Sequence, residues 1–418
     1  MVEAGTVNIN QVADVIMGQS PPSTVCNTEQ DGLPFYQGVT DFGDMFPTPR
    51  MYCTEPKRIA EIGDILFSVR APIARINIAN QRCATGRGIA IIRARKDSDQ
   101  IFLRLALQSI SWYWESLEGS GAIFSNAKKE DILNAEIPWG NDEFRKVVTD
   151  HISTLEESEI IHSSLNSDIQ QIILALFRSW FIDFEPVKSR AEGKLPYGMD
   201  AETADLFPDT FVDSKIGPVP TGWHVINMRE GLSFLKDGDH TPPKRVEEGI
   251  PLYSGKDVNN GYYLDKESPT YVTKEYHDWF HRKWEPKIGD ILIASVGSVG
   301  KTAVVREGDL PFMLQRSVAL LRPSERINSE YLHHYMQSQP IQWLIKSLSV
   351  RSVQATLSLS DIGGIPLLLP PIEILDKFRV ICSLLHSQID SSIDSVLNIG
   401  KIRDALLPRL MSGELSVS

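Results

Sequence analysis

The sequence has no long apolar run and no basic leader segment. None of its 418 residues lies in a run of ~18 consecutive apolar residues, the length that a membrane-spanning helix needs. Residues 1–16 contain no Lys or Arg ahead of an apolar core, as a secretory signal would. We therefore expect a cytoplasmic protein that makes no contact with a membrane.

Cysteine is scarce and scattered along the chain. No two of the four cysteines are close enough in sequence to begin a zinc ribbon or a CxxC redox motif. They are Cys26, Cys53, Cys83 and Cys382. We expect free thiols in a reducing compartment, and no metal site.

An excess of positive charge is also missing. The chain has 42 Lys and Arg residues against 54 Asp and Glu residues, which gives a formal net charge of -12. It is therefore not a polycation that binds nucleic acid by bulk charge alone. With 42% hydrophobic and 23% charged residues, the composition is that of a globular protein and excludes disorder of the whole chain. At roughly 150 residues per domain, the length favours two or three domains.

No complete catalytic motif is present. Residues 297–302 resemble a phosphate-binding loop, but that motif requires a glycine where this chain has Ser295. The carboxylates that begin at Asp209 resemble part of a nuclease site, but their proline-rich segment has no room for the paired strands of such a site. His277 and His281 are four residues apart, and no third metal ligand is evident beside them. The sequence therefore predicts a protein without enzymatic activity.

Short segments of the sequence recur in the same order in its two halves. Residues 33–36 match 250–253, 63–66 match 289–292, 131–132 match 361–362, and 144–145 match 378–379. The offsets drift only from 217 to 234 residues, so chance is a poor explanation for the matches. We infer a duplication of about half the chain.

Each half ends in a segment whose apolar residues alternate at spacings of four and three, which predicts two long heptad helices. The first seam runs through Phe144, Val148, His151, Leu155, Ser158, His162, Leu165, Ile169, Ile172 and Leu176. The second seam runs through Leu375, Phe378, Cys382, Leu385, Ile389, Ser392, Val396, Ile399, Arg403, Leu406 and Leu410. At ~1.5 Å per residue each helix is about 50 Å long, and we expect the two helices to pack on each other.

The polar positions of the two seams allow two interpretations. They fix the register of the helices at some cost in stability, or they are solvated where the helix ends splay apart. The residues concerned are His151, Ser158, His162, Ser392 and Arg403. For helix packing or for a partner interface, the candidate residues are Leu155, Leu165, Ile169, Leu176, Phe378, Leu385, Ile389 and Leu406.

These patterns predict an α+β protein in which two repeated domains, rich in short strands, are separated by two long helices. The expected parts are a domain at 1–140, a helix at 141–181, a proline-rich connector at 182–222, a second domain at 223–369, and a helix with a tail at 370–418.

A local basic stripe covers residues 65–96, which contain no Asp or Glu. Its basic residues are Arg70, Arg75, Arg82, Arg87, Arg93, Arg95 and Lys96. Guanidinium groups bind phosphates and read guanine through two hydrogen bonds, so the stripe favours a DNA-binding face. The alternative is a solvated strand face whose arginines pair with carboxylates elsewhere.

The equivalent region of the second half has fewer basic residues. Lys301, Gln315, Arg316 and Arg322 lie in it, and a later stretch at 339–360, which also lacks acidic residues, holds Lys346 and Arg351. The DNA-binding candidates of the whole chain are Arg70, Arg75, Arg82, Arg87, Lys128, Lys301, Gln315, Arg316 and Arg351.

Over nearly its whole length the chain resembles the DNA-specificity subunit of type I restriction-modification systems. The segments that carry the likeness are Gly63-Asp64-Ile65-Leu66-Phe67-Ser68-Val69-Arg70-Ala71-Pro72, Gly86-Arg87-Gly88, 176–186 (LFRSWFIDFEP), Gly289-Asp290-Ile291-Leu292, Gly297-Ser298-Val299-Gly300, and 406–415 (LLPRLMSGEL).

This resemblance implies that 1–140 and 223–369 are α/β target-recognition domains, held apart by an antiparallel coiled-coil pair of helices. Each domain would read one half of a bipartite site on double-stranded DNA, and the halves would lie about one duplex turn apart, ~34 Å. Because the two halves of the chain share only short matches, we expect an asymmetric target. Base-reading residues do not transfer, since recognition domains of this family diverge strongly.

The resemblance also implies partners. Two adenine methyltransferase subunits would bind through the helical regions, joined in the full complex by a translocating restriction subunit. S-adenosylmethionine, ATP and Mg²⁺ would belong to those partners, so the chain would bind no cofactor directly. The alternative function is a protein-interaction scaffold whose duplicated domains bind polypeptide and whose arginines are structural.

Overall fold

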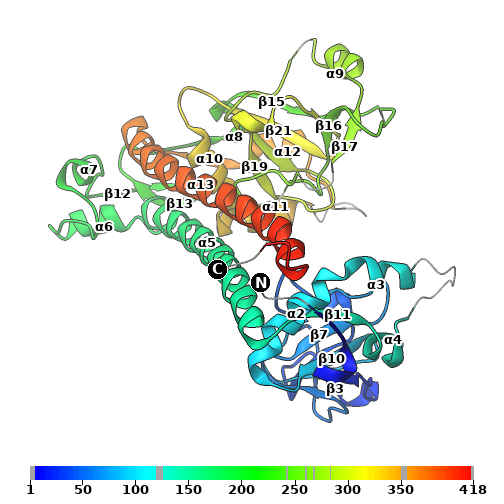
Figure 1. Cartoon of the computed structure of the whole chain (residues 1–418). Coiled ribbons are helices and arrows are strands. Elements are labelled where there is room, and N and C mark those ends of the chain that lie inside the picture. Colours follow the sequence, from blue (N-terminus) through cyan, green and yellow to red (C-terminus); the bar gives the residue numbers. More distant parts are fainter. Residues whose placement is uncertain are drawn as a thin grey trace. The chain divides into compact units, whose positions relative to one another are not determined.

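The structure is a computed structural model that describes residues 5–118, 126–241, 243–258, 261–266, 269–282, 284–349 and 355–415. The chain folds into two compact units (Figure 1). The first unit contains residues 1–164 and 392–418, and the second contains 165–391. This division passes through both long helices, whereas the boundaries expected from sequence follow changes in sequence pattern. Those boundaries stay predictions.

A four-stranded antiparallel sheet lies in the middle of the first unit, in the order β2-β10-β7-β8. Its strands are β2 (Ala13–Met17), β10 (Ile89–Ala94), β7 (Ile65–Ser68) and β8 (Ile76–Ile78). All four residues of β7 are buried, because both faces of this strand are covered, and its sequence is accordingly an apolar run without alternation. A second sheet has the order β3-β5-β4-β9-β6, with β4 (Leu33–Tyr36) and β9 (Cys83–Thr85) parallel.

Helices cover one face of the first sheet. They are α1 (Ile9–Val12), α2 (Gln100–Ser109), α3 (Ser111–Glu118) and α4 (Lys129–Leu133), and β1 (Gly5–Asn8) pairs with β11 (Glu136–Trp139) beside them. The remaining short strands are β3 (Cys26–Asn27), β5 (Tyr52–Cys53) and β6 (Ile59–Ala60). Phe67, Phe102, Ile132 and Ile137 meet in the core that these elements enclose.

The second unit repeats the same order of elements, which confirms the predicted duplication. Its central sheet has the order β15-β21-β18-β19, formed by β15 (Leu232–Asp237), β21 (Val318–Pro323), β18 (Ile291–Ala294) and β19 (Thr302–Val304). The pairing of β14 (His224–Asn227) with β22 (Pro366–Leu369) repeats that of β1 with β11. The parallel pair β16 (Ile250–Tyr253) and β20 (Met313–Leu314) repeats β4 and β9.

Further elements complete the second unit. They are α6 (Glu185–Ala191), α7 (Ala201–Asp205), β12 (Phe211–Ser214), β13 (Gly217–Pro220), α8 (Met228–Gly231), β17 (Thr270–Val272), α9 (Lys274–Phe280), α10 (Ser329–Gln337), α11 (Gln339–Ser349) and α12 (Leu359–Gly364). The proline-rich connector thus forms two short helices and a hairpin, since its prolines prevent a longer helix.

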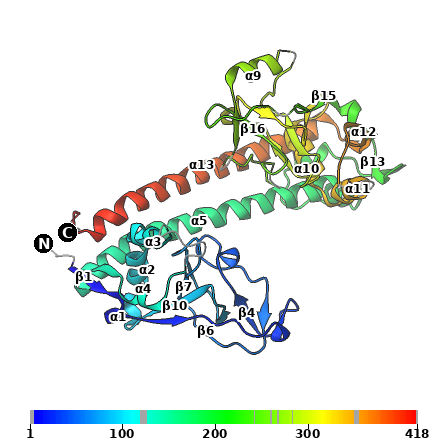
Figure 2. The ribbon, with the colours of Figure 1, turned by 90° about the vertical axis from the view of Figure 1, so that its right-hand side faces the viewer.

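Two helices of 40 residues each, α5 (Asp142–Phe181) and α13 (Ile372–Met411), confirm the predicted pair of long helices (Figure 2). The two run antiparallel within each unit. In the first unit Nδ1 of His162 lies 3.0 Å from Oγ of Ser392, and in the second the rings of Phe177 and Phe378 are 5.8 Å apart. None of the described helices combines the length and the apolar character needed to cross a bilayer.

The heptad pattern predicted the buried face of α13 better than that of α5. Along α13 the seam residues are buried or half-buried, among them Phe378, Leu385, Ile389 and Leu406. Along α5 Ile169 is buried and Leu155 and Leu176 are half-buried. Leu165 is 38% exposed, so its assignment to the seam was wrong.

Two other assignments to the α5 seam were also wrong, because in each case the next residue in the sequence is the buried one. Ile152 is buried instead of His151, and Ile173 instead of Ile172. In the first unit the buried row Phe144, Val148 and Ile152 packs against the sheet and α2 as well as against α13. A row with a spacing of four is the surface that a helix presents to such a neighbour, whereas alternating spacings describe a helix pair alone.

Two buried ion pairs also attach α5 to the first unit. Nη2 of Arg104 on α2 lies 2.5 Å from Oε2 of Glu156, and Nε of Arg145 lies 3.0 Å from Oδ1 of Asp99. Both arginines donate two hydrogen bonds to their carboxylate. Separating such a pair would leave a buried charge without compensation. The pairs therefore hold α5 in a defined position on the first unit.

An aromatic cluster anchors the end of α5 in the second unit. The rings of Trp180 and Phe181 pack against Phe378 of α13, and Trp223 of the following segment lies 6.0 Å from Phe181. Tyr331 of α10 contacts the same ring at 4.9 Å. The motif at 176–186 therefore joins the long helices to the second domain through ring packing.

We expect Phe378→Ala to lower the free energy of unfolding by about 3–5 kcal/mol, because it removes a fully buried ring from this cluster. Phe378 is 0% exposed, whereas Leu384 on the same helix is 68% exposed. The control Leu384→Ala should therefore change stability by less than about 0.5 kcal/mol. Urea denaturation followed by circular dichroism measures both, and equal effects would contradict the packing described.

Candidate nucleic-acid interface

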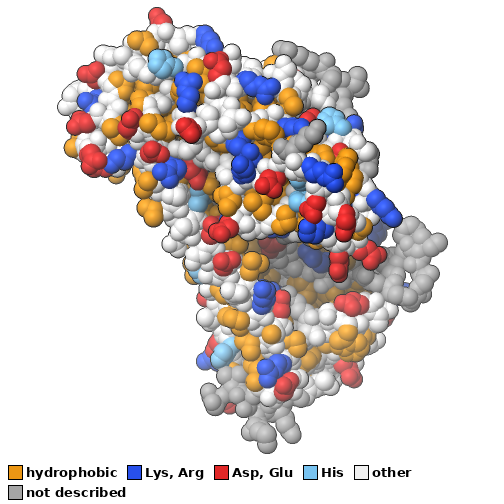
Figure 3. Space-filling view, turned by 90° about the horizontal axis from the view of Figure 1, so that it is seen from above, with side chains coloured by type: hydrophobic (Ala, Val, Ile, Leu, Met, Phe, Trp, Pro, Cys, Tyr) orange, Lys and Arg blue, Asp and Glu red, His pale blue; other side chains and the backbone are white. Residues whose placement is uncertain are grey.

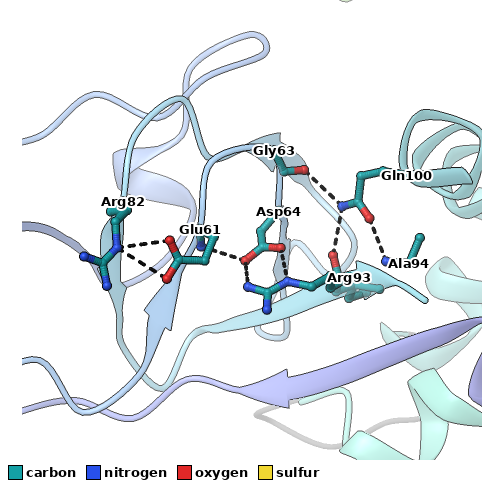
Figure 4. A network of polar contacts seen from close by, with 8 residues as sticks. Glu61, Gly63, Asp64, Arg82, Arg93, Ala94 and Gln100 are labelled. Carbon is teal, nitrogen blue, oxygen red and sulfur yellow. Dashed lines mark hydrogen bonds and ion pairs between the residues drawn. The ribbon is translucent and has the colours of Figure 1, made fainter. Parts of the chain in front are cut away.

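The motif Gly63-Asp64 forms a clip at one end of the sheet in the first unit. Oδ1 and Oδ2 of the buried Asp64 accept hydrogen bonds from Nε and Nη2 of Arg93, at 2.7 and 2.5 Å, and Oδ2 also accepts one from the backbone N–H of Glu61 at 2.7 Å (Figure 4). Gln100 continues the network by donating to the carbonyl of Gly63 at 3.0 Å. A φ of 88° at Gly63 requires glycine in this turn.

The second unit repeats this clip with the equivalent residues. Asp290 accepts from Nε and Nη2 of Arg322, at 2.7 and 2.8 Å, and from the backbone N–H of Lys287 at 2.7 Å. Ser329 donates to the carbonyl of Gly289 at 2.6 Å, in the place of Gln100. Hydrogen bonding to the aspartate raises the pKa of each arginine, against the opposing effect of burial. The recurring Gly-Asp-Ile-Leu motif is thus structural.

Some residues of the basic stripe form ion pairs within the described part of the chain, and others do not. Besides Arg93, Nε of Arg82 lies 3.0 Å from Glu61, Arg95 lies 3.5 Å from Asp14, and Lys96 lies 3.7 Å from Asp142. For these residues the alternative interpretation, a strand face paired with carboxylates, is the one that fits. Arg82 was a DNA-binding candidate; its pair with Glu61 places it at the clip end of the sheet, apart from the arginines at the other end.

The other arginines of the stripe meet at the opposite end of the sheet. Arg70, Arg75 and Arg87 are exposed, and among the described residues no ion pair involves them. The backbone N–H of Val69 donates to the carbonyl of Gly88 at 3.0 Å, which joins the turn that follows β7 to the loop that precedes β10. These contacts place the three arginines on adjoining loops.

A third loop joins the same end of the sheet and brings Lys128 to it. The backbone N–H of Ala127 donates to the carbonyl of Val69 at 2.9 Å, and Arg70 forms an isolated β-bridge with Asn126. Lys128 is exposed next to this bridge. Three of the predicted arginines and the predicted lysine therefore share one surface.

Two exposed amides lie on the same surface, and the sequence analysis missed them. The backbone N–H of Gln19 donates to Thr85 at 3.0 Å, beside Arg87. Gln37 lies close to Gly88. A Cβ atom added to Gly88 would be 2.2 Å from the carbonyl oxygen of Gln37. Glutamine reads adenine through two hydrogen bonds. No local signal marks these two residues, because the sheet alone brings them to the arginines.

The second unit places its predicted residues at equivalent positions. The carbonyl of Lys301 accepts from Ala294 at 2.8 Å, as that of Arg75 accepts from Ser68 at 2.9 Å. Arg316 is exposed on the loop before β21, where Arg87 precedes β10, and Gln315 beside it is half-buried. Arg351, the remaining candidate, lies outside the described residues.

Residues 297–302, which resemble a phosphate-binding loop, form part of this surface. They connect β18 to β19, whereas a phosphate-binding loop leads into a helix. Gly300, at a φ of 91°, takes the place of Ala74 at 62°, and both donate a backbone hydrogen bond across the same turn. This loop therefore lacks the helix into which a phosphate-binding loop leads.

The two surfaces differ in chemistry at equivalent positions. Asp239 occupies the place of Gln19, and it accepts hydrogen bonds from the hydroxyl of Tyr276 at 2.6 Å and from the backbone of Thr241. His240 beside it lies 2.5 Å from Asp237. The face drawn in Figure 3 shows basic and acidic side chains interspersed, without a broad positive field. On this face the basic groups are therefore local features.

Comparison with known proteins confirms the family resemblance. The putative type I restriction enzyme MjaX specificity subunit of Methanocaldococcus jannaschii is 38% identical over 144 residues, and the match spans only 34% of this chain and 34% of that protein. The MjaIX specificity subunit of the same organism is 27% identical over 370 residues, which are 86% of this chain and 79% of that protein. No protein-family model matches the chain.

The fold has also been seen before. The crystal structure of the type I restriction-modification system S subunit from M. genitalium aligns with a TM-score of 0.54 at 18% identity, over 98% of this chain and 96% of that chain. The likeness supports the α+β fold with a repeated domain and two long helices.

We expect Asp64→Asn and Asp290→Asn each to lower the free energy of unfolding by about 1.5–3 kcal/mol, because each removes a charged acceptor of three hydrogen bonds. Asp14→Asn is the matched control, since it breaks only the exposed pair with Arg95 and should cost less than about 1 kcal/mol. Denaturant titration of the three variants measures the difference. A loss in Asp14→Asn as large as in the other two would argue against the clip.

Proposed function

We propose that this chain is the DNA-specificity subunit of a type I restriction-modification complex and reads a bipartite, asymmetric target on double-stranded DNA. The observation that carries the proposal is the repeated basic surface at one end of each central sheet, in a chain that aligns over 86% of its length with a specificity subunit. One surface presents Arg70, Arg87 and Lys128, and the other presents Lys301 and Arg316.

Each surface contacts one half of the target. Its arginines and lysines bind backbone phosphates or guanine, and its amides bind base edges. Gln19 is exposed in one unit, whereas Asp239 at the same place in the other is buried and engaged by Tyr276 and Thr241. The two half-sites therefore differ in sequence. The acidic remainder of the protein opposes binding to DNA at other positions.

The long helices bind the partner subunits. Large apolar side chains remain exposed along both helices, and such residues mark surfaces for other proteins. On α5 they are Ile160, Ile161, Leu165, Ile172 and Leu174, and on α13 they are Ile372, Val380, Leu384, Leu397 and Ile402. The proposed occupants are two adenine methyltransferase subunits and, in the full complex, a restriction subunit. Leu165 thus fits a partner interface although it is not a seam residue.

In this proposal the chain itself catalyses no reaction. Methyl transfer from S-adenosylmethionine and cleavage driven by ATP with Mg²⁺ take place on the partner subunits. The incomplete catalytic motifs of the sequence support this assignment of activities to the partners. So does the segment at 297–302, which resembles a phosphate-binding loop but forms a turn between two strands.

A map of methylated adenines in cells tests the function. We expect co-expression of this chain with its methyltransferase to methylate a split motif with a fixed gap, which the methyltransferase alone leaves unmodified. A stable complex without new methylation would instead favour a scaffold that binds polypeptide.

Charge reversal at the candidate surface tests the DNA contacts. We expect Arg70→Glu with Arg87→Glu to weaken DNA binding by the assembled complex and to reduce its salt dependence by about one unit of slope per lost phosphate contact. Fluorescence anisotropy at several salt concentrations measures both quantities.

The control is Arg82→Glu with Arg95→Glu, which changes the net charge equally at the clip end of the same sheet. It should bind DNA nearly as the unmodified complex does. Size-exclusion chromatography should show normal subunit assembly for both pairs of variants. Equal losses of binding in the two pairs would mean that charge alone, and not this surface, determines affinity.

A further inference from the structure

Three side chains of types that commonly ligate metals lie close together inside the second unit. Glu330 and His334 lie one helical turn apart on α10, and His386 reaches them from α13. One ligand atom of each lies within 4.8 Å of the ligand atoms of the other two, and all three residues are buried. Carboxylate and imidazole are the ligands that Zn²⁺ takes besides thiolate.

Four polar atoms of this cluster have no hydrogen-bond partner among the described residues. Both ring nitrogens of His334 are buried without one, and so are Oε2 of Glu330 and Nδ1 of His386. The last two atoms are 3.3 Å apart, but their geometry does not form a hydrogen bond. Leaving a buried polar group unsatisfied costs about 1–3 kcal/mol, and native proteins contain few such groups. A shared cation would satisfy Oε2 of Glu330, Nδ1 of His386 and one ring nitrogen of His334 together.

Neighbouring groups hold two of the three side chains in place. The hydroxyl of Tyr262 donates to Oε1 of Glu330 at 2.6 Å, which leaves Oε2 to face the histidines. The ring of the same tyrosine stacks on His386 with centroids 3.6 Å apart. Such contacts orient metal ligands and maintain their geometry.

The guanidinium of Arg306, which lines the cavity beside Glu330, does not pair with the cluster. It is engaged by Asp390 and by the ring of Tyr263, and among the described residues no ion pair joins it to Glu330.

A cavity borders the cluster on the side of Glu330. It has a volume of about 580 Å³, and its lining includes Tyr262, Glu330, Asn328 on the preceding turn and Ser383 on α13. Glu330 is the residue of the cluster that lines the cavity, and neither histidine does. An entry path is one of the requirements for a plausible metal site.

We propose that Glu330, His334 and His386 bind one divalent transition-metal ion of the zinc class, which fastens α13 to α10. Two ligands that each lie about 2.0–2.1 Å from a tetrahedral ion are roughly 3.3 Å apart, the separation of Glu330 and His386. The third ligand closes on the ion by a small side-chain movement. The proposal does not depend on DNA binding, since the ion would stabilise a helix contact within one unit.

The sequence analysis predicted no metal site, and it considered only His277 and His281. Those two rings are 4.8 Å apart, but their Nδ1 atoms are engaged by Asp278 and by the carbonyl of Trp284. The Glu-x-x-x-His spacing on α10 was the available signal. It is too common in helices to indicate a site without the distant third ligand.

Zinc binding by the purified full-length chain tests the proposal. The protein is stripped with a chelator and titrated with ZnCl₂ against a chromophoric competitor, and thermal unfolding is recorded with and without the metal. We expect one equivalent of Zn²⁺ to bind and to raise Tm. His334→Gln and His386→Gln should each weaken binding more than 100-fold and abolish the rise in Tm.

His333→Gln is the matched control. His333 is the buried neighbour of His334 on the same helix, but its Nδ1 lies 3.1 Å from the hydroxyl of Thr302 and it is not part of the cluster. This variant should bind one equivalent. The proposal is overturned if the unmodified chain binds no Zn²⁺ and shows no rise in Tm. It is also overturned if all variants bind equally, and neither result bears on methylation or DNA binding.

Discussion

The ion pair between a buried aspartate and a strand arginine, Asp64 with Arg93 and Asp290 with Arg322, organises both halves of this protein. Each aspartate follows a glycine with positive φ and accepts three hydrogen bonds, so it fixes where the central strand begins and which strand lies beside it. A sheet clipped at one end leaves the loops at its other end available for function. That end carries the exposed arginines and amides.

The second constraint is the apolar face of α5 and α13, each of which contributes to both units. Polar contacts along this face specify how the helices pair in the first unit. Ser392 is 2% exposed and donates to the carbonyl of His162 at 3.2 Å, and Arg403 donates to Glu159 at 2.7 Å. For these residues the interpretation that polar seam positions fix the register is the one that fits. His151 is exposed and follows the alternative.

Duplication lets one scaffold carry two different surfaces. The clip and the strand order are the same in both units, whereas the loops at the far end differ in their charged and amide groups. Stability and recognition thus depend on different residues, and the second can vary without loss of the first. The buried cluster of Glu330, His334 and His386 belongs to neither function, since its three side chains lie between α10 and α13 and are not exposed.

The sequence by itself determined the duplication, the two long helices and the positions of most candidate basic residues. Those features are periodic or local, so they can be recognised in the sequence without knowing which residues are neighbours in the fold. Only the tertiary structure decided which arginines are paired, because Asp64 and Arg93 are 29 residues apart and meet across two strands. It also decided between Ile172 and Ile173 on α5, since adjacent apolar residues look alike until the packing partner is known. Gln19, Gln37 and His386 became candidates for the same reason: folding alone brings them to the groups they act with.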